Sequence, residues 1–140
     1  MNEQLLTLNR WSRPGRALSD VKAIVIHWFM APKQTAQQVR DYWERRKDGG
    51  GGYGSAHIVI DDRETILAVP LTEIAYHVGA DEYTDFAERH ISYYPNSHTI
   101  GVELAHDDMS GKPSADVWHR AVTVCADLCD RFKVPTLDRS

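Results

Sequence analysis

The sequence predicts an α/β domain in which a central mixed β-sheet is flanked by helices. Two short β-branched runs, residues 23–27 and 99–104, have the length and composition of buried strands. Two longer segments, which begin near residues 35 and 114, repeat apolar residues at helical spacing. A chain of 140 residues is long enough for one core of this kind. We therefore expect residues 1–140 to form a single domain.

The first predicted helix begins at Thr35. Thr35 and Gln38 have the spacing of a capping box, and Val39 and Trp43 fall on one face of the helix that follows. We expect this helix to end near Lys47, before the glycine-rich run at residues 48–54. That run is equally consistent with a plain linker and with a loop that gates a substrate.

A β-hairpin is predicted after the glycines. Residues 57–60 and 65–69 are apolar runs, and Asp61-Asp-Arg-Glu64 between them has the composition of a turn. Residues 80–98 are polar and rich in tyrosine, so we expect a long surface loop there.

The last helix gives the clearest periodicity. Ser114 or Asp116 can cap it, and apolar residues recur at helical spacing as far as Phe132. Cys125 and Cys129, the only two cysteines, lie within this apolar stripe and face the same side. Such a pair can bind metal or undergo redox chemistry. Its place in the stripe favours reduced, buried core residues remote from any metal.

Composition argues against two classes of partner. The formal net charge of -4 and the lack of a basic stripe argue against a nucleic-acid binder or nuclease. No apolar run approaches the length of a membrane span. The N-terminal residues Met-Asn-Glu-Gln lack the layout of a signal peptide. We therefore expect neither nucleic acid nor membrane as a partner.

Three polar residues occupy positions where a sheet can present chemistry. His27 ends the first strand, and His77 lies in a short segment bounded by glycine. Glu103 alternates with Val102 and Leu104, so its side chain points to the opposite face from theirs. Each signal alone is weak, because a strand-end histidine is commonly structural and a strand glutamate can pair with a nearby cation.

In combination, four segments resemble the type-2 N-acetylmuramoyl-L-alanine amidase family, which includes cell-wall amidases and peptidoglycan-recognition proteins. In chain order they are Ile24-Val-Ile-His27, Ser55-Ala-His-Ile-Val-Ile-Asp61, Ala75-Tyr-His-Val-Gly79 and Thr99-Ile-Gly-Val-Glu-Leu104. Four such segments in this order, followed by an amphipathic helix, are a specific signal that covers residues 20–134. The chain looks most similar to the phage and clostridial endolysin branch.

The resemblance implies roles for these residues. His27 would be the first zinc ligand, and Glu103 the carboxylate that activates metal-bound water. His77, Trp28 and His57 would bind substrate. His57, on the neighbouring strand, would lie beside the substrate site but not on the metal.

The implied chemistry requires these residue types. Zinc lowers the pKa of bound water to about 7 and polarises a carbonyl. A nearby carboxylate can carry the water proton to the leaving amine. Some relatives place a tyrosine just before the residue that matches His57, whereas this chain has Ala56. Glu103 is therefore expected to carry the acid–base role alone.

The expected zinc site is incomplete in this chain. A catalytic zinc ion takes about three protein ligands. In the family the others come from a segment after the long helix, so we expect them beyond Ser140 and expect the chain to be C-terminally truncated. Residues 134–138 look like the lead-in to another strand. The remaining histidines that could substitute are expected at the surface: His90, His98, His106 and His119.

The predicted function is zinc-dependent hydrolysis of the amide between N-acetylmuramic acid and L-alanine in bacterial peptidoglycan. The alternative is a non-catalytic module that binds peptidoglycan or muropeptides, although Glu103 favours the enzyme. The expected site of action is the cell wall. It would be reached without a signal peptide, either through a holin-type route for a phage-encoded enzyme or after release from the cytoplasm. The sequence predicts no oligomeric state.

Overall fold

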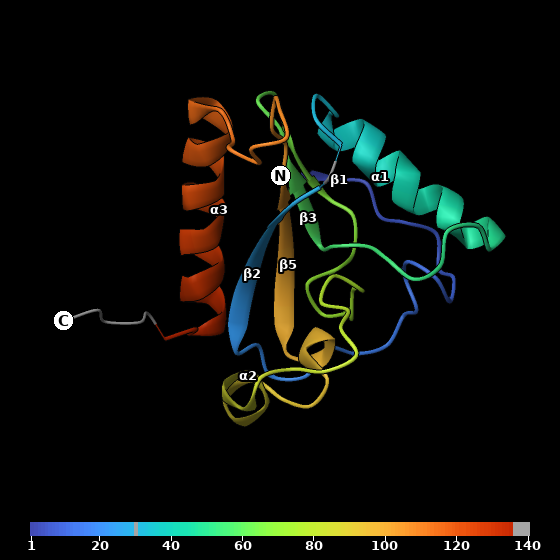
Figure 1. Cartoon of the computed structure of the whole chain (residues 1–140), viewed down its shortest axis with the longest axis vertical. Helices are drawn as coiled ribbons and strands as arrows, with labels where there is room; N and C mark the ends of the chain where they lie inside the picture. Colours follow the sequence, from blue (N-terminus) through green and yellow to red (C-terminus); the bar gives the residue numbers. More distant parts are fainter. Residues whose placement is uncertain (30, 136–140) are drawn as a thin grey trace.

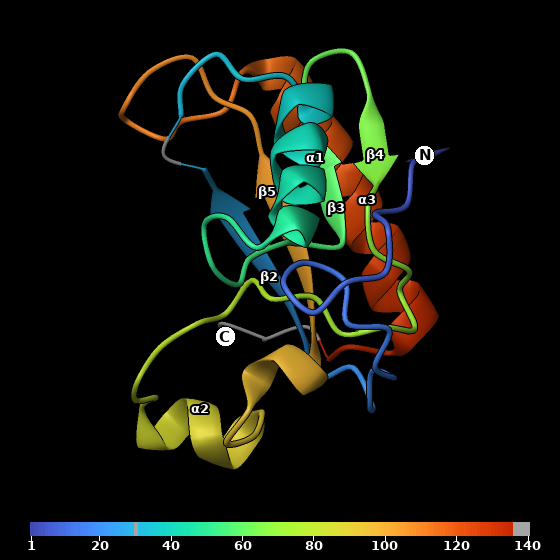
Figure 2. The ribbon, with the colours of Figure 1, turned by 90° about the vertical axis from the view of Figure 1, so that its right-hand side faces the viewer.

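The computed structural model describes residues 1–29 and 31–135. A mixed sheet lies between two long helices, with α1 (Ala36–Arg45) on one face and α3 (Ala115–Phe132) on the other (Figures 1 and 2). The predicted α/β fold is therefore confirmed. The sheet has the strand order β1-β4-β3-β5-β2, formed by β1 (Asn2–Glu3), β2 (Ala23–Trp28), β3 (Ile58–Ile60), β4 (Thr65–Leu67) and β5 (Thr99–Leu104).

Strand direction decides which residues meet. β3 and β4 form the predicted antiparallel hairpin, whereas β5 runs parallel to both β3 and β2. Parallel neighbours end at the same edge of a sheet. The ends of β2 and β5 therefore lie together, with His27 in register with Glu103.

The sheet separates two apolar cores. On one side, Val39 and Trp43 of α1 pack with Val59 of β3. On the other side, α3 packs over Ile58 and Ile60, the neighbours of Val59 in the same strand. This alternation follows from the pleat, which sends successive side chains to opposite faces.

Both long helices begin where their caps predict. The Thr35 hydroxyl accepts a hydrogen bond from the Gln38 N–H. The Thr35 N–H in turn donates to the side-chain oxygen of Gln38, which completes a capping box. Ser114 caps α3 by accepting from the Val117 N–H.

Several short elements were not predicted. The expected surface loop at residues 80–98 contains α2 (Asp85–His90), capped by Thr84, and the 3₁₀ turn Pro95–Ser97. A second 3₁₀ turn, Arg46–Asp48, extends α1, and β1 adds two residues to the edge of the sheet. Elements this short show no clear periodicity, because periodicity needs at least two or three turns to appear.

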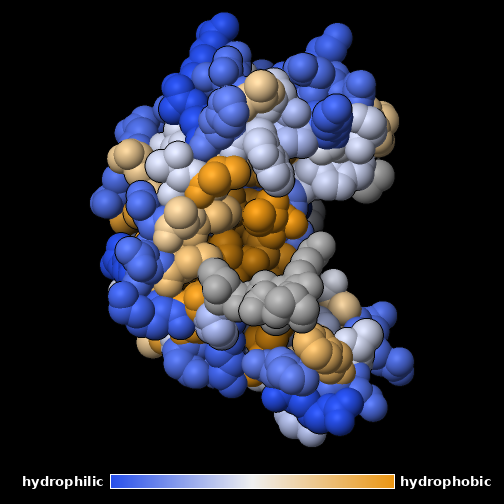
Figure 3. Space-filling model, turned by 90° about the vertical axis from the view of Figure 1, so that its left-hand side faces the viewer, coloured by the Kyte–Doolittle hydropathy of each residue, from blue (hydrophilic) through white to orange (hydrophobic). Residues whose placement is uncertain are grey.

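The outer part of the α3 stripe is less buried than expected. Cys125 and Cys129 are free thiols, as predicted, but both are only partly buried, so the prediction that they are buried core residues was wrong. Trp118 and Val122 are about half exposed, as is Ile26 on the edge strand β2. Apolar side chains gather in a hollow on this side of the molecule (Figure 3). The helix contacts β2 and β3, yet Ile26 of β2 stays exposed beside it.

Two further expectations concern the ends of elements. Of residues 134–138, which were predicted to lead into a strand, residues 136–138 lie outside the described part of the chain. Within the described part, no helix combines the length and apolar character that a membrane crossing requires.

Candidate active site

His27 and Glu103 occupy adjacent positions on neighbouring parallel strands. They are register partners between β2 and β5, so both side chains leave the same face of the sheet, the face that carries α1. Backbones of paired strands lie ~4.8 Å apart. The prediction that Glu103 points away from Val102 and Leu104 is confirmed, because those two residues belong to the core under α3.

Glu103 is a strongly perturbed carboxyl group on this face. Its Oε2 atom is buried and accepts no hydrogen bond from the residues that the structure describes. Burial disfavours the ionised form and raises the pKa of Glu103 to about 7. A carboxyl group with this pKa can both take up and release a proton near neutral pH, which a general acid–base catalyst requires.

A groove of about 460 Å³ runs from Glu103 along α1. Phe29, Val39 and Trp43 form much of its wall, and Tyr42 and Arg45 stand along the helix. The groove is therefore largely apolar and aromatic, with a carboxyl group at the sheet and a single guanidinium on the helix.

His27 is connected to a row of hydrogen-bonding groups through His77. The Nε2 atom of His27 lies 3.2 Å from Nδ1 of His77, and Nε2 of His77 lies 3.2 Å from Oγ1 of Thr99. The Thr99 hydroxyl donates to the Pro95 carbonyl, so it accepts from His77 Nε2–H. His77 Nδ1 must then accept from His27 Nε2–H. We therefore assign Nδ1 as the nitrogen of His27 that is free to bind a ligand.

His77, which was predicted to bind substrate, lies over Gly101 and does not line the groove. A Cβ atom at position 101 would come within 2.7 Å of the His77 ring. Burial and the neighbouring imidazoles of His57 and His27 lower the pKa of His77 to about 3, so it is neutral. Thr99 and Gly101 thus belong to the site, although neither was predicted; a glycine inside a strand was the available signal.

His57 does not reach the groove. It is completely buried, its Nδ1 accepts from Gly101 N–H at 3.0 Å, and its Nε2 donates to the Glu73 carbonyl at 2.9 Å. Burial lowers its pKa to about 4. The predicted substrate contact is therefore corrected to a supporting position under His77, whose ring centre lies 5.6 Å away.

Trp28 is also displaced from its predicted role. It follows His27 directly, so its side chain points to the other face of β2. Its ring packs edge-on against His106, with 4.9 Å between centroids, and lies close to Gly111. The structure therefore does not bring Trp28 to the face that carries His27 and Glu103.

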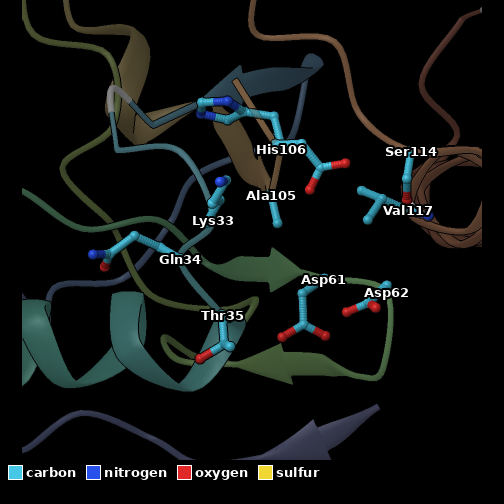
Figure 4. Close-up of a pocket in the computed structure, with 10 residues that line it drawn as sticks. Lys33, Gln34, Thr35, Asp61, Asp62, Ala105, His106, Ser114 and Val117 are labelled. Carbon is cyan, nitrogen blue, oxygen red and sulfur yellow. Dashed lines mark hydrogen bonds between the residues drawn. The ribbon is translucent and has the colours of Figure 1, made fainter. Parts of the chain in front are cut away.

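His106 is buried rather than exposed as expected. Its two ring nitrogens face the carbonyl oxygens of Phe29 and Asp108, which joins the loop after β2 to the loop after β5. It borders a small pocket of about 220 Å³ (Figure 4). Asp61 in the same pocket accepts three backbone N–H groups. These polar groups are therefore engaged in holding loops together.

The described residues do not by themselves fit a zinc ion. Within residues 1–29 and 31–135, no three His, Cys, Asp or Glu side chains come together as a metal site. His27 supplies one free nitrogen, whereas a catalytic zinc ion takes about three protein ligands. His90 and His98 turn ring nitrogens to the backbone carbonyls of Phe86 and Asp20.

The chain has relatives among bacterial amidases. It is 31% identical to N-acetylmuramoyl-L-alanine amidase BlyA of Bacillus subtilis (strain 168), over 95% of this chain and 36% of BlyA. It is 30% identical to N-acetylmuramoyl-L-alanine amidase CwlL of Bacillus licheniformis, over 96% of this chain and 37% of CwlL. The chain thus spans little more than a third of the length of these relatives.

The fold is also found in solved structures. The structure of PlyL matches 96% of this chain with a TM-score of 0.71 and 20% identity, and this chain spans 76% of it. At that identity the likeness shows a common fold. The sequence also matches a family model, because residues 17–139 fit the profile described as N-acetylmuramoyl-L-alanine amidase. The chain therefore belongs to the N-acetylmuramoyl-L-alanine amidase family.

Proposed function

We propose that this chain forms the catalytic sheet of an enzyme that hydrolyses the amide between N-acetylmuramic acid and L-alanine in bacterial peptidoglycan. The observation that carries the proposal is Glu103, a partly buried residue at one end of the groove whose Oε2 atom is buried and receives no hydrogen bond from the described residues. Family membership supports the choice of bond and a site of action at the cell wall.

Glu103 is proposed as the acid–base catalyst. With a pKa raised to about 7, it takes the proton of the attacking water and returns it to the amine of L-alanine as the amide bond breaks. The apolar part of the groove wall lowers the local dielectric constant, which strengthens these charge interactions. His77 holds the ring of His27 in a fixed orientation through Nε2.

We propose zinc as the cofactor, with Nδ1 of His27 as one ligand and further ligands outside the described residues. When bound, zinc supplies Lewis acidity toward the carbonyl and acidifies water. A non-catalytic muropeptide-binding module is the second candidate, favoured by the lack of a three-ligand cluster among residues 1–29 and 31–135.

Cell-wall digestion separates the two candidates. The full-length protein should release new amino termini of L-alanine from purified walls without creating new reducing ends. Glu103→Gln should lower that rate by about 10²-fold or more, and the exposed Glu82→Gln should match the wild type. Binding to walls without release of amino groups would identify the module instead. Full activity of Glu103→Gln would exclude Glu103 as the catalyst.

A further inference from the structure

The cations at the end of α1 differ in whether a protein group binds them. Arg46 donates to two carbonyls of the glycine-rich loop, and Arg40 and Lys47 both form ion pairs with Glu44. Arg45 is exposed, and its guanidinium lies 6.0 Å from the centre of the Tyr42 ring. It forms no hydrogen bond or ion pair within the part of the chain that the structure describes.

Arg45 lines the same groove as Glu103. The two side chains line one groove, yet they form no ion pair with each other in the described structure. The guanidinium is therefore not neutralised by the catalytic residue. It remains available to a ligand that occupies the groove.

The proposed position of the scissile bond defines which groups of a stem peptide lie along the groove. With the scissile amide at Glu103, the next group on the peptide side is the methyl of L-alanine, which suits the apolar wall formed by Phe29 and Val39. The residue after alanine is D-glutamate, linked through its γ-carboxyl group. It therefore carries a free α-carboxylate, which some bacteria convert to an amide.

We propose that Arg45 binds this α-carboxylate and makes the enzyme selective for stem peptides in which D-glutamate is not amidated. A guanidinium and a carboxylate can form two parallel hydrogen bonds, a geometry that an amide cannot match. This inference rests on the proposed function, because it takes Glu103 as the position of the scissile bond. Arg45 is a specificity determinant here, separate from the acid–base step.

Three soluble substrates test the proposal with the full-length protein. The first is muramyl-L-alanyl-γ-D-glutamyl-L-lysine, and the second replaces D-glutamate with D-isoglutamine. The third carries D-isoglutamine and also an amide at the C-terminus of lysine. The first pair differs only at the α-carboxylate, and the second pair reports any recognition of the terminal carboxylate.

We expect kcat/KM to be about tenfold or more higher for the first substrate than for the second. Arg45→Gln should remove this preference by slowing the first substrate alone, and Arg45→Lys should retain part of it. Arg120→Gln is the matched control, because Arg120 is exposed on α3 across the sheet. Equal slowing of all substrates by Arg45→Gln would overturn the proposal. The proposal would also be overturned if Arg45 affected only the difference between the second and third substrates, because Arg45 would then recognise the terminal carboxylate.

Binding to the Glu103→Gln protein gives a readout that does not depend on turnover. Calorimetric titration should show weaker binding of the D-isoglutamine tripeptide, and Arg45→Gln should abolish the difference in Kd. Cleavage of both substrates at equal rates would overturn the role of Arg45 and leave the amidase function intact. Failure to cleave or bind either substrate would overturn both.

Discussion

The ring of His77 lies over the backbone of Gly101, where a glycine leaves room for the imidazole. The N–H of Gly101 donates to His57, so Gly101 lies between two histidines. His77 in turn contacts His27, one of the two residues proposed to act on the substrate or its cofactor. A single backbone position therefore supports the orientation of the ligand nitrogen.

Gly101→Ala should destabilise the protein and impair the site. The added methyl would come within 2.7 Å of the His77 ring, and overpacking of this kind costs about 1–3 kcal/mol. Urea denaturation should show the loss, and wall digestion should show reduced activity. Gly79→Ala is the matched control for stability, because nothing lies within 4 Å of a Cβ at that position. Equal stability of the two variants would contradict the packing described.

Glu103 should make the stability of the chelator-treated protein fall as pH rises. The unfolded chain releases this proton near pH 4.5, whereas the folded protein keeps it until about pH 7. Between these values the folded state binds more protons, so the free energy of unfolding decreases with pH. The loss at pH 8 is on the order of 2–3 kcal/mol.

Denaturation of wild type and Glu103→Gln across pH 4 to 8 checks this expectation. The two proteins should have similar stability near pH 4, and Glu103→Gln should be the more stable at pH 8. Glu82→Gln should follow the wild type throughout. A constant difference between wild type and Glu103→Gln would show that burial does not perturb this carboxyl group.

Asp61 connects the β3–β4 hairpin to the beginning of α1. Its carboxylate accepts from the N–H groups of Arg63 and Glu64 in the turn and from Ala36 N–H at the helix N-terminus. Because α1 forms one wall of the groove, this single side chain sets where that wall begins. The helix N-terminus also favours a negative charge at this place.

Asp61→Ala should lower the free energy of unfolding by about 2–4 kcal/mol, because one buried and two partly buried N–H groups would lose a charged acceptor. The neighbouring Asp62 is exposed, and Asp62→Ala should stay within about 0.5 kcal/mol of wild type. Urea denaturation with both variants makes the comparison. A small effect of Asp61→Ala would mean that water replaces the carboxylate without cost.

Elements with clear periodicity could be predicted from the sequence, and so could the face on which Glu103 lies. Each follows from the local pattern of apolar residues and caps, as at Thr35. The environments of His57, His106 and Trp28 could not be predicted in this way. Their burial depends on partners far along the chain, such as Glu73, Phe29 and Gly111. The residues next to these three in the sequence therefore do not indicate those contacts.

The polypeptide of residues 1–140 should not retain stoichiometric zinc. Its described residues present one free imidazole nitrogen at the site, and a single ligand holds zinc too weakly to survive gel filtration. Metal analysis of the eluted protein checks this, with His27→Ala as the reference for unspecific zinc. One zinc per chain that disappears in His27→Ala would mean that these residues assemble a complete site.

The pairing of β2 has a consequence for how long the site persists. β2 lies at the edge of the sheet and pairs only with β5 in the described part of the chain, whereas β5 is paired on both sides. Edge strands open locally at a lower free energy than central strands. His27 would then separate from Glu103 while the two cores remain folded. The lifetime of the proposed catalytic arrangement is thus governed by the opening of one strand, and global denaturation overestimates it.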